Sequence, residues 1–151
     1  MNEIKPELKT LVTIHTALLG AQLLFGVIAY ITNKKQLIEL DENFTLIFQI
    51  VTIALSVLLV AASFILFNKK IRLIRETNDA LNEKISQYKI VSIIKFSLIE
   101  APCLLSIIGY YFTNDIFFFV LVGALIILFA AQRPTVALVS HHLLVNKDDL
   151  I

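Results

Sequence analysis

The sequence predicts an all-α integral membrane protein, folded as a four-helix bundle made of two helical hairpins. Composition is the first reason, since 58% of the 151 residues are hydrophobic and only 17% are charged. Soluble domains are usually about 45–50% apolar and about 25% charged. The spacing of the apolar residues is the second reason, because they gather in four long segments without polar faces. We therefore expect a single membrane domain over 1–151.

Each apolar segment approaches the length of a membrane span, which is about 20 residues. We expect spans at about 11–32, 44–67, 90–112 and 116–133. The first two contain no acidic residue, lysine or arginine, whereas the third contains Lys95 and Glu100. The fourth is the shortest, because its unbroken apolar run stops at Ala131.

The lysines and arginines predict how the spans are oriented. With four spans, both termini and the central connector share one side of the membrane. That side holds most of the basic residues: Lys5, Lys9, Lys69, Lys70, Arg72, Arg75, Lys84, Lys89, Lys95, Arg133 and Lys147. The other side holds only Lys34 and Lys35. Because cytoplasmic loops carry the basic excess, we expect both termini in the cytoplasm.

The polar connector at 68–89 shows a helical pattern. Steps of three and four residues separate Ile71, Ile74, Asn78, Leu81, Ile85 and Tyr88. Thr77, Asn78 and Asp79 fall midway and are good N-cap residues, so we favour a cytoplasmic helical hairpin that reverses there. The alternative is one amphipathic helix lying on the membrane surface.

The remaining connections are shorter. Asp115 is expected to cap the fourth span, which makes spans three and four a tight hairpin. The tail at 134–151 is expected to form a short interfacial helix.

A shift of 80 residues lays the first span on the third and suggests a duplication. Leu18, Ala21, Leu24, Ile28 and Tyr30 then coincide with Leu98, Ala101, Leu104, Ile108 and Tyr110. This pattern is expected of two hairpins related as parallel repeats.

Glu100 is the principal candidate for a functional residue, as a proton or cation site. It lies about ten residues into its span, where an acidic side chain costs about 2.5–3.5 kcal/mol and normally has a partner. Its candidate partners are His15, Gln22, Gln132 and Arg133. Pro102 frees the carbonyl of Leu98 and can open an ion site beside the acid. The alternatives are a carboxyl that only holds helices together and a proline that only kinks the helix.

Other chemistry finds little support in the sequence. No metal site is expected, because His15, His141 and His142 lack the ligand spacing that such sites use. Cys103 is interpreted as a packing residue, and no nucleophile, base and orienting group occur together, so we expect neither an enzyme nor a cofactor. A net charge of +1 argues against nucleic-acid binding.

Three short segments resemble an uncharacterised family of small bacterial four-span membrane proteins. They are Leu98-Ile99-Glu100-Ala101-Pro102, the Tyr-Phe-Thr-Asn turn at 111–114, and Gln132-Arg133-Pro134-Thr135. The resemblance implies the four-span topology and a bacterial inner membrane, and it implies no activity. In its lone membrane carboxylate, the chain also resembles the duplicated proteolipid subunits of rotary ATPases and the small multidrug-resistance transporters. In the proteolipid subunits, however, the hairpin loops face the cytoplasm, whereas here they are expected outside. In the transporters the acid lies in the first span, whereas here it lies in the third.

Two classes of function are compatible with these observations. The first is a non-catalytic membrane protein that acts by assembly in the lipid bilayer, as a homo-oligomer or as a small accessory subunit of a membrane complex. The second is a small proton- or cation-coupled transporter or channel element that uses Glu100.

Overall fold

The computed structural model describes residues 6–32 and 41–150, and every regular element in them is helical. The helices are α1 (Pro6–Thr32), α2 (Glu42–Glu76), α3 (Leu81–Thr113), α4 (Ile116–Ala131), α5 (Val136–Leu143) and a 3-10 turn, η1 (Lys147–Leu150). The predicted all-α class is therefore confirmed.

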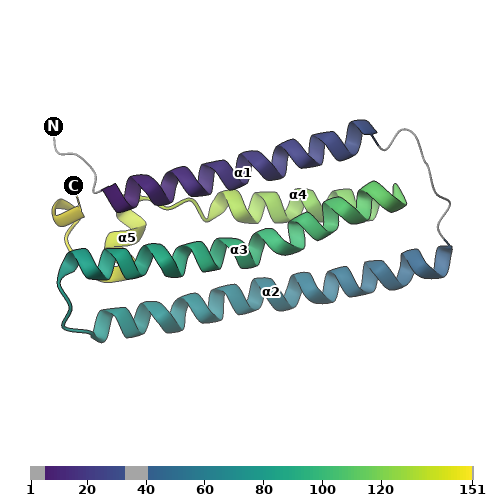
Figure 1. Cartoon of the computed structure of the whole chain (residues 1–151). Coiled ribbons are helices and arrows are strands. Elements are labelled where there is room, and N and C mark those ends of the chain that lie inside the picture. Colours follow the sequence, from purple (N-terminus) through teal and green to yellow (C-terminus); the bar gives the residue numbers. More distant parts are fainter. Residues whose placement is uncertain (1–5, 33–40, 151) are drawn as a thin grey trace.

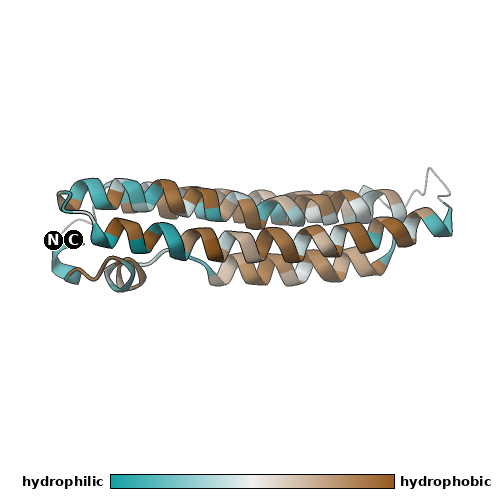
Figure 2. Ribbon diagram, turned by 90° about the horizontal axis from the view of Figure 1, so that it is seen from below, coloured by the Kyte–Doolittle hydropathy of each residue, from teal (hydrophilic) through white to brown (hydrophobic). Residues whose placement is uncertain are grey.

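Three of these helices, α1, α2 and α3, are individually long and apolar enough to cross a membrane. The fourth, α4, has only 16 residues, and it passes the same test only when it is joined to α5, which is bent by 73° from it. The described part of the chain thus has three helices that can span a membrane, or four spans if α4 and α5 together form one. Figure 2 shows hydrophobic residues along the middle of the long helices and hydrophilic ones gathered toward the ends.

The four long helices lie side by side, with α1 and α2 at opposite edges and with α3 and α4 between them (Figure 1). The central helix is α3, which packs against α1, α2 and α4. It runs parallel to α1. His15 of α1 contacts Phe96 of α3, and Ala29 and Ile107, which come later in the same two helices, line one groove. The two residues of each pair lie about 80 positions apart in the sequence.

Local sequence explains the tight turn between α3 and α4. Asn114 ends α3 in the left-handed conformation, with φ 53°, which asparagine adopts more readily than most residues. Asp115 then caps α4, because its side chain accepts a hydrogen bond from the amide of Phe117 at 2.9 Å. Asp115 also accepts a hydrogen bond from Gln49 at 2.6 Å, which ties α2 to the start of α4.

The connector forms a helical hairpin, as α2 continues to Glu76 and α3 begins at Leu81. Its predicted apolar stripe is buried at Ile71, Ile74, Ile85 and Tyr88. The N-cap differs from the expected one: it is Ala80, which has no side chain to cap the helix. Asp79 instead accepts a hydrogen bond from Gln87, eight residues further along the chain.

Small residues bring the central helices close together. On α2 and α3, the buried polar residues are mostly serine and threonine. The hydroxyls of Ser56, Ser63 and Ser106 donate hydrogen bonds to backbone carbonyls of their own helix. Gly109 on α3 faces the buried ring of Phe118 on α4, where an added methyl group would lie 2.6 Å from a ring carbon. Such close approach is typical of helix packing in membranes.

Candidate functional site

Glu100 lies near the middle of α3. It shares a helical stripe with Leu104, Ile107 and Tyr111, and these three line a groove of about 370 Å³ against Phe25 and other α1 residues. The side chain is half-buried. Within residues 6–32 and 41–150 it has no hydrogen bond or ion pair. Its carboxyl group therefore finds no polar partner in the described part of the chain.

Two of the four candidate partners are engaged elsewhere. The Nε2 atom of His15 lies 3.0 Å from the carbonyl oxygen of Phe129, and its ring stacks on the Phe129 ring with centroids 4.7 Å apart. Gln132 accepts a hydrogen bond from Lys95. These contacts connect α1 to α4 and α3 to the end of α4, so both side chains serve helix packing instead of contacting Glu100.

Gln22 and Arg133 also form no hydrogen bond or ion pair with Glu100. Gln22 is fully buried, and neither its amide oxygen nor its amide nitrogen has a hydrogen-bond partner within the described residues. A buried amide without a partner costs free energy, which is why such groups are rare. Arg133 is exposed and lines a pocket between the start of α1 and the segment joining α4 to α5.

Pro102 and Cys103 are both buried beside Glu100. The carbonyl of Pro102 accepts a hydrogen bond from Ser106 at 2.7 Å, which satisfies one group near the proline. The thiol of Cys103 is free and buried. Because both side chains are buried, this part of α3 is packed.

The structure shows a buried cation that sequence reasoning passed over. Lys95 is only 7% exposed, and its ammonium donates a hydrogen bond to the side-chain oxygen of Gln132 at 2.6 Å. The same nitrogen lies 4.6 Å from the ring centroid of Phe64 and 4.4 Å from that of Phe67. Cations are attracted to aromatic faces at such distances. The sequence feature that could have revealed this buried cation is the position of Lys95, five residues inside an apolar span.

Separate polar contacts attach α5 to α2 and α3. The hydroxyl of Tyr88 lies 3.0 Å from Nδ1 of His142, and Arg75 donates to the carbonyl oxygen of His142 at 2.5 Å. Burial lowers the pKa of His142 to about 4, with further lowering from the positive charges of Lys95, His141 and Arg75. The cluster formed by Tyr88, His142 and Arg75 thus docks α5 onto α2 and α3.

Metal chemistry receives no support from the described residues, where no three His, Cys, Asp or Glu side chains gather at a common point. No protein-family model matches this chain, and neither a curated protein nor a solved structure does. The functional argument therefore depends on the geometry around Glu100 and on the polar cluster at α5.

Proposed function

We propose that this protein is a non-catalytic membrane protein that acts by assembly, as a homo-oligomer or as a small accessory subunit of a membrane complex. We place it in a bacterial inner membrane as a four-helix bundle with both termini in the cytoplasm. The apolar helices and the uneven distribution of lysine and arginine support this placement. We also propose that it belongs to the uncharacterised four-span family that its three short segments resemble.

The observation that carries the proposal is Glu100. An acidic side chain at this depth costs about 2.5–3.5 kcal/mol unless it is paired or faces water. The described part of the chain supplies no partner. The half-buried carboxyl shares a helical stripe with Leu104 and Ile107, which line a groove whose rims, among them Phe25 and Ile108, are exposed. A helix of a neighbouring chain that enters this groove would bring a hydrogen-bond donor to Glu100.

Replacement of Glu100 tests the proposal directly. We expect the purified protein to have the mass of an assembly by native mass spectrometry, and Glu100→Leu to weaken that assembly. One interhelical hydrogen bond is worth about 1 kcal/mol in membranes, so the dissociation constant is expected to rise roughly fivefold. Ser97→Ala is the matched control, because Ser97 is exposed on the same helix and bonds only to the carbonyl of Ile93. A monomeric wild-type particle would contradict the proposal.

The second candidate function is a proton- or cation-coupled element. One observation favours it, the fully buried Gln22 whose amide has no described partner and which lies on the helix that packs beside Glu100. The two functions predict different behaviour for Glu100→Gln. An amide still forms hydrogen bonds, so assembly is expected to survive. Ion coupling needs the ionisable carboxyl, so proton flux into proteoliposomes would be lost if the second candidate were correct.

A further inference from the structure

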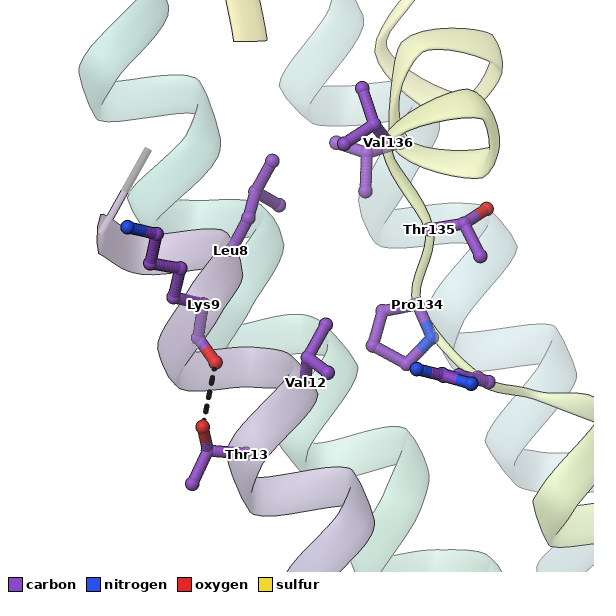
Figure 3. A pocket seen from close by; sticks show the side chains of 9 residues that line it. Leu8, Lys9, Val12, Thr13, Pro134, Thr135 and Val136 are labelled. Carbon is purple, nitrogen blue, oxygen red and sulfur yellow. Dashed lines mark hydrogen bonds between the residues drawn. The ribbon is translucent and has the colours of Figure 1, made fainter. Parts of the chain in front are cut away.

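A pocket of about 580 Å³ lies where α1 begins and where the chain passes from α4 to α5. Figure 3 shows Leu8 and Val12 of α1 on one side of it, with Pro134 and Val136 on the other. The space exists because α4 has 16 residues against 27 in α1, and because the chain then turns by 73° into α5. The first turns of α1 are consequently left uncovered by α4.

The polar lining of this pocket is positively charged. Arg133 lines it, is exposed, and has no side-chain hydrogen bond or ion pair within the described residues. Lys9 lies at its rim, and no acidic residue is among the lining residues. The pocket also borders the first turn of α5, where helix amides carry a partial positive charge. This end of the pocket is therefore suited to an anionic group.

The rest of the lining is apolar, which makes the pocket amphiphilic. Leu8, Val12, Val136 and Val139 form its hydrophobic part. Lys9 is two residues before the apolar stretch of α1, and Arg133 is two residues after that of α4. Both cations therefore lie at the level where lipid headgroups meet the hydrocarbon. A soluble anion would use the cations and leave the apolar wall uncovered. A phospholipid would cover both.

We propose that this pocket binds an anionic phospholipid, with its phosphate at Arg133 and one acyl chain against Leu8 and Val12. Basic pockets between membrane helices on the cytoplasmic side bind such headgroups. The inference does not depend on what Glu100 does, because the pocket is built from α1 and the α4–α5 segment. A failed assembly test therefore leaves it unaffected.

Lipid titration followed by native mass spectrometry tests the proposal on the full-length protein in detergent. We expect phosphatidylglycerol to bind about fivefold more tightly than phosphatidylcholine with the same acyl chains, as one favourable cation–headgroup contact implies. Arg133→Gln is expected to abolish this preference, and Arg133→Lys to restore part of it. Val12→Phe, which fills the pocket without changing charge, is expected to weaken binding of both lipids.

The control is Lys69→Gln, which removes one exposed positive charge of α2 outside the pocket. It is expected to leave the lipid preference unchanged. An equal loss in Lys69→Gln and Arg133→Gln would show that general charge attracts the lipid, and would overturn the proposal. So would a wild-type protein without a preference. Displacement of the lipid by millimolar glycerol phosphate would instead identify the site as one for soluble phosphate.

Discussion

At the scale of single residues, Lys95 shows how a cation is accommodated in an apolar environment without a described carboxylate partner. Its ammonium uses one amide oxygen, from Gln132, and the faces of two phenyl rings. Removal of a charge and removal of its partner have different costs, because an unpaired buried charge retains its full desolvation penalty.

We therefore expect Gln132→Leu to destabilise the protein more than Lys95→Met. The first change leaves the ammonium without its oxygen acceptor and is expected to cost about 1–3 kcal/mol. The second removes the charge together with its desolvation penalty, and it is expected to be nearly neutral. The double variant is expected to recover most of the loss. Unfolding in mixed micelles measures these differences, and equal destabilisation by the two single changes would contradict the explanation.

The same scale explains why the four predicted partners of Glu100 do not meet it. His15 and Gln132 are near the correct depth, but each is held by a group on another helix. Sequence position gives the depth of a residue in a span. It does not give the rotation of one helix relative to its neighbours, on which side-chain contacts depend.

At the scale of helices, the contact between α3 and α4 depends on a missing side chain. Gly109 leaves room for the fully buried ring of Phe118, and both lie near the capped turn formed by Asn114 and Asp115. Two helices joined by so short a turn are held close together, so neither can move apart to admit a larger residue.

Gly109→Ala is expected to destabilise the protein by about 1–3 kcal/mol, because overpacking forces a buried ring out of its position. Gly20→Ala is the matched control, since no atom lies within 4 Å of an added methyl group there. Alanine also favours helix by up to about 1 kcal/mol over glycine, so the control is expected to be neutral or stabilising. Thermal unfolding in detergent compares the two, and a neutral Gly109→Ala would contradict the packing argument.

At the scale of the whole molecule, the ends of the helices differ in charge. The start of α1, the turn between α2 and α3, and α5 lie together at one end (Figure 1). Most lysines and arginines belong to this end. From the positive-inside rule we propose that this end faces the cytoplasm.

Thiol labelling in cells tests this orientation. Asn78→Cys, in the exposed turn after α2, is expected to react with a membrane-impermeant reagent only after the cells are permeabilised. Glu42→Cys, at the other end of α2, is expected to react in intact cells. The native Cys103 is buried and so gives little background. Reversed labelling of the two variants would overturn the proposed topology.

The sequence by itself determined the helical class, the positions of the apolar segments, and the reversal after α2. These follow from local chemistry: unbroken apolar runs, a capping aspartate at 115, and a stripe of residues at helical spacing. Each depends on neighbours within a few residues along the chain, so the sequence contains all the information that is needed.

Only the tertiary structure decided which side chains meet. It paired Lys95 with Gln132, left Glu100 and Gln22 without a described partner, and placed Arg133 in a pocket beside α1. It also showed that the chain bends by 73° between α4 and α5. These facts depend on how helices rotate and where they end relative to one another. In apolar segments that are hydrophobic all round, no polar stripe in the sequence specifies that rotation.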